Sequence, residues 1–255
     1  MKMQAATATA AGVLALALAL TACEVTLTPV EKSRPPATAE PSQQPSATAT
    51  KTPSDTKTPA DGTDEPGPVA EKWKTFTDAE KTVSFKLPDD WIVQVLPAPR
   101  KGALHLEVRN RDGDVAAMLN THIQGLGGAC QPESSRPYTV LASIPMDIPS
   151  SNESQGAVTP RFVYRVIQGN TNFYASYGIT DHSAGLDGKA CLVYNAVTSK
   201  QLGIFMFGDV LQFTSDPSGS PGLRAFPTIA DAQEYMLSSE YQNIQEMVTS
   251  LKALG

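Results

Sequence analysis

Residues 104–122 read LHLEVRNRDGDVAAMLNTH and carry the clearest strand pattern of the chain. Apolar and polar residues alternate on both sides of Asp112-Gly113, which is the period of a strand with one buried face. An Asp-Gly pair between two such runs is a strong signal for a β-hairpin with a two-residue loop. The sequence therefore predicts an antiparallel hairpin over 104–122 as part of a larger antiparallel sheet.

The predicted hairpin also determines which side chains share a face. With a two-residue loop, His105 lies across from Asn120, and His122 becomes a diagonal neighbour of His105. Glu107 stands beside His105 on the same face. Two imidazoles and a carboxylate on one surface are a candidate Zn or Cu site, and the alternative is a solvated polar face that includes histidine. The opposite face is predicted to be apolar and to consist of Leu104, Leu106, Val108, Val115, Ala117 and Leu119.

Strand-like patterns continue on both sides of the hairpin. Val83-Ser84-Phe85-Lys86-Leu87 alternates apolar and polar residues before a turn at 88–90. Further strands are predicted at 91–95, 115–122, 138–148, 161–168, 172–180, 190–198 and 203–213. The tripeptide Phe205-Met206-Phe207 is apolar on both faces, which predicts a buried core strand, with an apolar groove for a lipid or peptide as the alternative.

Helical spacing occurs only near the C-terminus. Thr228 followed by Asp231 resembles a capping box and predicts a short helix. A second helix is predicted over 239–254, with an apolar stripe that begins at Tyr241 and ends at Leu254. The fold class is therefore α+β, an antiparallel β-sheet packed against C-terminal helices.

Signals for catalysis are weak. Asp181-His182-Ser183 contains the three residue types of a hydrolytic triad, but adjacent side chains in an extended chain point away from each other. The Gly-rich pieces at 125–128 and 218–222 do not sit between a strand and a helix, as a nucleotide site requires. We therefore expect a protein without a cofactor that is not an enzyme.

The composition limits the classes of protein further. The chain has 255 residues, with 20 basic and 26 acidic side chains and a formal net charge of −6, which excludes a generally basic nucleic-acid-binding protein. Every Trp, Phe and Tyr lies within 71–255, which we expect to be a single folded domain. A domain of this size buries roughly 70% of its unfolded surface, so it needs no structural metal.

Residues 1–22 have the features of a secretory signal peptide. Lys2 precedes the apolar run 10–20, which is about half the roughly 20 residues that a membrane span requires. Leu20-Thr21-Ala22-Cys23 resembles the bacterial lipobox at all four positions. The resemblance implies a lipoprotein whose Cys23 carries diacylglycerol and palmitate and holds the protein on the extracytoplasmic face of the cell membrane. The alternative is an ordinary soluble secreted protein.

Residues 23–70 are predicted to be a disordered linker between lipid and domain. The segment 24–70 contains 9 Pro, 9 Thr and 4 Ser and no aromatic residue. Such a composition cannot bury enough apolar surface to offset the entropy of the chain. Its r.m.s. reach is on the order of 40 Å, which would hold the domain off the bilayer.

The folded domain resembles a known family in three segments. These are TVSFKLPDDW at 82–91, Pro137–Ile148, and Ser239–Gln242 leading into Ser250-Leu251-Lys252. The pattern is similar to the PsbP-like lipoproteins of actinobacterial envelopes. The resemblance implies an antiparallel sheet flanked by helices, and an accessory or binding role without established catalysis.

Two cysteines remain once Cys23 is assigned to lipid. Cys130 and Cys191 would share an oxidising compartment with no other partner, which predicts a disulfide between them. The alternatives are a redox-active thiol or thiolate ligands of a metal, although neither cysteine has a CxxC motif or a histidine near it in the sequence.

These observations predict a lipid-anchored, non-catalytic binding or accessory protein of the cell envelope. Its partner would be an envelope protein, a glycan or a lipid, in addition to the membrane that holds its N-terminal lipid. The rival hypothesis is a metal-dependent or hydrolytic envelope enzyme that uses His105, Glu107 and His122. A solute-binding transport subunit is disfavoured, because one domain leaves no interdomain cleft.

Overall fold

The computed structural model describes residues 69–216 and 222–254. The predicted signal peptide, Cys23 and nearly all of the predicted linker lie outside the described residues. The helices are α1 (Ile229–Tyr235) and α2 (Ser239–Thr249), and a 3-10 turn, η1, covers Pro132–Ser134. In chain order the strands are β1 (Trp73–Thr77), β2 (Val83–Pro88), β3 (Ile92–Val95), β4 (His105–Arg109), β5 (Val115–Ile123), β6 (Arg136–Pro145), β7 (Ala157–Gln168), β8 (Phe173–His182), β9 (Lys189–Ala190), β10 (Leu192–Tyr194), β11 (Val197–Ser199), β12 (Gly203–Gly208), β13 (Gln212–Thr214), β14 (Arg224–Phe226) and β15 (Lys252–Ala253).

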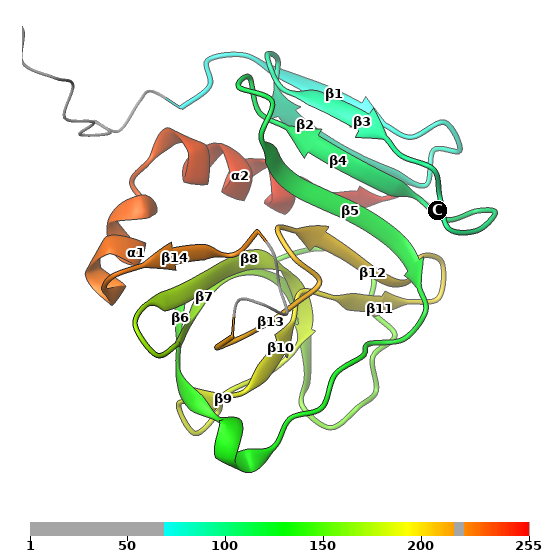
Figure 1. Cartoon of the computed structure of the whole chain (residues 1–255). Coiled ribbons are helices and arrows are strands. Elements are labelled where there is room, and N and C mark those ends of the chain that lie inside the picture. The colour runs from blue at the N-terminus through cyan, green and yellow to red at the C-terminus, as the bar shows by residue number, and fades with distance from the viewer. Residues whose placement is uncertain (1–68, 217–221, 255) are drawn as a thin grey trace, which may run out of the picture. The chain divides into compact units, whose positions relative to one another are not determined.

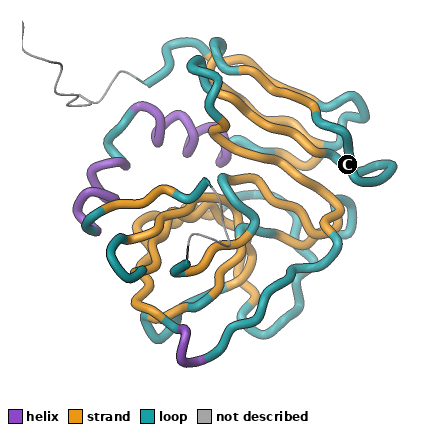
Figure 2. Tube along the Cα trace, viewed as in Figure 1, coloured by secondary structure: helices purple, strands orange, loops and turns teal. Residues whose placement is uncertain are grey.

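The strands form one large sheet and two small ones (Figures 1 and 2). The large sheet has the order β3-β4-β5-β12-β8-β7-β6-β9, with β11 beside β12 and β14 beside β8. A three-stranded sheet has the order β1-β2-β15, and β10 pairs with β13. Each strand pairing in the described part of the chain is antiparallel, so the expected α+β class with an antiparallel sheet and C-terminal helices is confirmed.

The β4–β5 hairpin has the predicted register but a different turn. His105 pairs with Asn120, as expected. The two-residue loop is wrong, because the Asn110 N–H donates to the Asp114 carbonyl at 2.9 Å and leaves three residues between them. Gly113 at φ +89° ends this turn, and the register shifts by one residue on β5, which restores the predicted pairing.

The bulge in β5 also changes which residues reach the core. Val115, expected on the apolar face, is 42% exposed, whereas Ala116 is 1% exposed. The carbonyl of Ala116 accepts the hydroxyl of the buried Tyr177 at 2.6 Å. The bulge therefore buries two successive residues of β5, Ala116 and Ala117, which simple alternation does not predict.

The main core lies between the sheets and α2. Val83, Phe85 and Leu87 of β2 are buried in alternation, and the ring of Phe85 lies 4.8 Å from that of Phe207, centroid to centroid. Phe205, Met206 and Phe207 are all buried, so the core-strand interpretation is confirmed. From α2 the core receives Tyr241, Ile244, Met247 and Val248.

A second apolar cluster lies near the β10–β13 pair. It contains Tyr138, Ile167, Ala190, Val193, Val210 and Phe213. The predicted disulfide between Cys130 and Cys191 is present and ties the segment before η1 to the chain between β9 and β10. These side chains form a small core that is separate from the main one.

The C-terminal helices begin as predicted, but the second one ends early. The Thr228 hydroxyl accepts the Asp231 N–H and the Asp231 carboxylate accepts the Thr228 N–H, which confirms the capping box. The helix predicted over 239–254 ends at Thr249, because residues 252–253 pair with β2 instead. The Ser250 hydroxyl accepts the Lys86 N–H at 2.8 Å and starts this pairing.

Other boundaries were also predicted incorrectly. The single strand expected at 190–198 is divided into β9, β10 and β11, and the one expected at 203–213 into β12 and β13. Strands β1 and β14 were not predicted, since their short segments show no clear alternation.

In residues 69–216 and 222–254, no helix has the length and apolar character needed to cross a bilayer.

Two glycines allow the two parts of the large sheet to meet. Strands β12 and β8 share one register pair, Gly208 with Gly178. A Cβ atom on Gly208 would lie 2.6 Å from the Gly178 Cα, and one on Gly178 would lie 2.7 Å from the Asn195 Cβ. Both distances are shorter than real side chains tolerate, so the junction requires glycine on both strands.

We expect Gly208→Ala to lower the free energy of unfolding by about 1–3 kcal/mol, because the new methyl group meets backbone atoms that cannot move independently. Gly127→Ala is the matched control, since a Cβ there has no neighbour within 4 Å and Gly127 has no positive φ. Urea denaturation followed by tryptophan fluorescence measures both. Equal stability of the two variants would contradict the proposed role of the junction.

Candidate functional site

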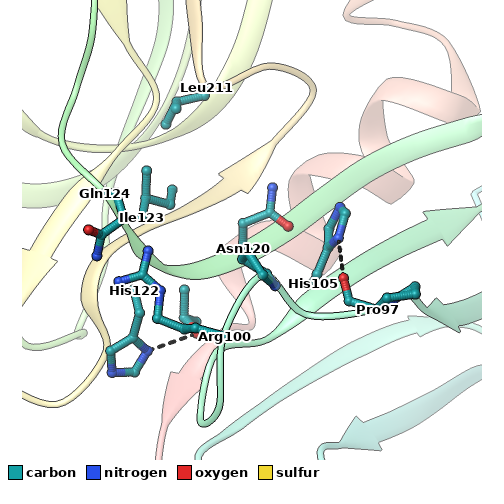
Figure 3. Close-up of a pocket in the computed structure, with 10 residues that line it drawn as sticks. Pro97, Arg100, His105, Asn120, His122, Ile123, Gln124 and Leu211 are labelled. Atoms are coloured by element: carbon teal, nitrogen blue, oxygen red, sulfur yellow. Dashed lines mark hydrogen bonds between the residues drawn. The ribbon is translucent and has the colours of Figure 1, made fainter.

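A pocket of about 490 Å³ opens beside the β4–β5 hairpin (Figure 3). Strands β4 and β5, the loop between β3 and β4, and the loop after β12 form its walls. Its apolar lining consists of Pro97, Pro99, Ile123 and Leu211, and its polar lining of Arg100, His105, Asn120, Thr121, His122 and Gln124. The volume lies in the range of pockets that bind small molecules.

His105 attaches the β3–β4 loop to the hairpin. Its Nδ1 lies 3.2 Å from the Pro97 carbonyl (Figure 3). A carbonyl only accepts hydrogen bonds, so the Nδ1 atom of His105 carries a proton and donates it to Pro97. The His105 carbonyl also accepts the Leu96 N–H at 2.8 Å. One residue thus holds the loop by both its backbone and its side chain.

His122 reaches the same pocket from an irregular position on β5. Its φ is +54°, and its N–H donates to the Leu202 carbonyl. Gly203 packs against it, because a Cβ on Gly203 would lie 3.2 Å from the His122 Cα. The register between β5 and β12 shifts at the same place, which re-aims the imidazole away from a regular strand direction.

The Thr121 hydroxyl connects the two strands behind the pocket. It accepts the Leu104 N–H at 2.8 Å and lies 3.2 Å from Nδ1 of His122. A hydroxyl has one proton and two lone pairs, so Thr121 can donate to Nδ1 or accept a second bond from it.

Asn120 and Arg100 provide the remaining polar groups. The Asn120 amide contacts the Met206 sulfur at 3.7 Å, and its buried Oδ1 has no hydrogen-bond donor among the described residues. With its amide oxygen turned toward the guanidinium, Gln124 accepts a hydrogen bond from Arg100 Nη2 at 2.8 Å. The described lining contains a permanent cation and no carboxylate. The pocket therefore suits a ligand with an apolar body and an acceptor or anionic group.

The structure brings together only part of the predicted metal site. His105 and His122 both line the pocket, but Glu107 does not and instead forms an ion pair with Arg109. The Nε of Arg109 also donates a hydrogen bond to the side-chain oxygen of Gln94 on β3. Among residues 69–216 and 222–254, no group of three or more His, Cys, Asp and Glu side chains is placed to hold a metal ion. The alternating pattern placed Glu107 on the same face as the two histidines. In the structure its carboxylate pairs with Arg109 of the same strand.

Each side chain of Asp181-His182-Ser183 has a polar partner outside the tripeptide. The Asp181 carboxylate accepts from Ser150 and Asn152, and the Ser183 hydroxyl donates to the Gly156 carbonyl. His182 instead has Ser154 3.5 Å from its Nδ1. No sequence pattern predicted that Ser154 lies near His182, because this contact depends on the turn before β7.

No family model matches the chain, and no curated protein or solved structure is significantly similar to it.

A buried polar network crosses the junction between β8 and β12. The Asp209 carboxylate accepts hydrogen bonds from the Ser176 hydroxyl at 2.6 Å and from the N–H groups of Tyr177 and Val210. Asn195 donates to the same carboxylate at 3.3 Å. Burial raises the pKa of Asp209 to about 7, although the hydrogen bonds from Ser176 and the two backbone groups act to lower it.

We expect Asp209 to make the protein less stable as the pH rises from about 4 to 7. Its pKa is higher in the folded chain than its ordinary value of 3.8, so in this window the folded chain keeps a proton that the unfolded chain has lost. Asp209→Asn removes this contribution. The variant should therefore lose less stability than the wild type between pH 5 and pH 8, as measured by urea unfolding at each pH.

Asp112→Asn is the control for this measurement, because Asp112 is exposed in the β4–β5 turn. It should keep the pH dependence of the wild type. If the Asp209→Asn and Asp112→Asn curves coincide, Asp209 does not exchange its proton on unfolding.

Proposed function

We propose that the protein is an extracytoplasmic lipoprotein that binds a small amphiphilic ligand of the cell envelope. Residues 1–22 direct secretion, acylated Cys23 anchors the chain, and residues 23–70 tether the domain 71–255. The pocket beside the β4–β5 hairpin, which we name the hairpin pocket, takes the ligand. A non-catalytic binding role is the function that this arrangement supports best.

The single observation that carries this proposal is the chemistry of the hairpin pocket. Pro97, Pro99 and Leu211 offer apolar contacts, while Arg100 offers a positive charge at the same opening. The described lining contains no carboxylate that would repel an anion. An acyl chain with an acidic headgroup satisfies both features, because its tail gains apolar burial and its head gains a charge-assisted hydrogen bond.

The PsbP-like resemblance is consistent with such an accessory role, and we propose it as the finer description of the fold. The motif Val83–Trp91 that carries the resemblance forms β2 and the turn before β3. Val83, Phe85, Leu87 and Trp91 all enter the core. The motif is therefore a structural element of the domain, and the ligand-binding residues lie elsewhere.

The ligand class can be tested with laurate as the probe. We expect purified full-length protein to bind laurate, with chemical-shift changes at residues around the hairpin pocket. Arg100→Gln should weaken binding by about tenfold or more, because a hydrogen bond to a charged group contributes about 1.5–3 kcal/mol.

Arg111→Gln is the matched control, since Arg111 is exposed in the β4–β5 turn and does not line the pocket. It should bind laurate as the wild type does. Equal affinities of the Arg100→Gln and Arg111→Gln variants would reject the hairpin pocket as the site for an acidic headgroup.

The membrane anchor is tested by metabolic labelling with palmitate. We expect the wild type to incorporate the label and to sediment with membranes, and Cys23→Ala to do neither, because only a thiol at the lipobox position accepts diacylglycerol. A double variant, Cys130→Ala with Cys191→Ala, should still be labelled. Membrane association of unlabelled Cys23→Ala protein would show that another feature anchors the chain.

A further inference from the structure

A second pocket, of about 150 Å³, lies on the face of β6, β7 and β8, with residues that are separate from those of the hairpin pocket. Arg161 and Arg165 both line it, and Val163 lies between them on the same face of β7. His182 of β8 and the Ser143 hydroxyl of β6 line it as well. Among the described residues, the lining thus contains two arginines and one histidine and no carboxylate.

Arg165 is the unusual member of this group. It is 2% exposed, and no ion pair links it to any carboxylate in the described part of the chain. Its Nη2 donates to the Tyr194 carbonyl and to Asn195 Oδ1, and its Nη1 lies 3.4 Å from the Tyr138 hydroxyl. Its Nε has no acceptor among the described residues.

A buried guanidinium surrounded only by neutral partners is costly. Isolating a charge from water costs several kcal/mol, and neutral hydrogen bonds offset only part of this. The ring of Phe213, 5.6 Å from the Arg165 Cζ, adds a weak cation–π contact. Asn195 connects Arg165 to Asp209, but a carboxyl whose pKa is about 7 carries only part of a negative charge at neutral pH. A bound anion would provide the missing countercharge.

Arg161 and Ser143 supply donors at the same pocket. Arg161 donates from Nε to the Thr159 carbonyl and from Nη1 to the Ser143 hydroxyl at 3.1 Å. No hydrogen bond engages its Nη2 within the described residues. The Ser143 hydroxyl accepts from Arg161, so its own proton remains free to be donated. A second guanidinium and a hydroxyl thus accompany the charge of Arg165.

We propose that this pocket, which we name the arginine pocket, binds a phosphate group. Two guanidinium groups with neighbouring N–H and O–H donors match a dianion that has several acceptor oxygens, and they exceed what a single carboxylate needs. The volume admits one such group with a small substituent. The phosphate can be free inorganic phosphate or the phosphate monoester of a larger molecule, and both present the same oxygens to the site. This proposal does not depend on the ligand of the hairpin pocket.

Isothermal titration of the full-length protein with sodium phosphate, at constant ionic strength, tests the proposal. We expect saturable binding to the wild type and at least a tenfold loss of affinity in Arg161→Gln. Arg161 makes its side-chain hydrogen bonds near the surface, so this variant should fold. Arg165→Met should abolish binding, and its folding is checked separately by circular dichroism.

Arg100→Gln is the matched control, because it removes a guanidinium from the hairpin pocket and should leave phosphate affinity unchanged. The same variants separate the two proposals, since Arg161→Gln should still bind laurate. Glycerol 3-phosphate distinguishes the sources: tighter binding than phosphate indicates a monoester, and weaker binding indicates the free ion. The proposal is overturned if phosphate does not bind, if acetate binds equally well, or if Arg161→Gln retains the affinity of the wild type.

Discussion

The close approach of Gly208 to Gly178 holds the large sheet together. At this one register pair, the β3-β4-β5-β12 part of the large sheet joins the β8-β7-β6-β9 part. Asn195 closes over Gly178 and donates to the carbonyls of Tyr177 and Val210 on either side of the junction. Because Gly178 and Gly208 have no side chains, the backbones approach closely enough for these polar contacts to form, and the contacts hold the two parts in one orientation.

The junction also explains why polar groups are buried so near the centre of the domain. Asp209 directly follows Gly208, and Ser176 lies two residues before Gly178, so both reach Asn195. Asn195 in turn accepts from Arg165, whose side chain lines the arginine pocket. One hydrogen-bonded chain therefore runs from the strand junction to the pocket wall. The hydrogen bonds among Ser176, Asn195 and Asp209 favour one arrangement of the strands over alternatives that would leave these groups unpaired.

The sequence predicted the elements whose evidence is local. The alternation around Asp112-Gly113 predicted a hairpin there, and the predicted pairing of His105 with Asn120 is correct because the β5 bulge offsets the error in the predicted loop length. The same alternation could not reveal the bulge at Ala116 or the positive φ of His122, since both depend on contacts with other strands. For the same reason Glu107 was grouped with the histidines, although Arg109 engages its carboxylate. The end of α2 was missed because Ser250 bonds to Lys86, far away in the chain.

Local sequence patterns correctly predicted an antiparallel sheet, a capped helix at Thr228 and a Cys130–Cys191 disulfide. These follow from periodicity, from capping chemistry and from the presence of two cysteines in the predicted domain 71–255. Only the tertiary structure decided that His105 and His122 share a pocket with Arg100, and that Arg161 and Arg165 share another that contains no carboxylate among its described residues. A pocket is formed by side chains from strands and loops that are distant in the sequence. These side chains come together only when the two parts of the large sheet meet at Gly178 and Gly208.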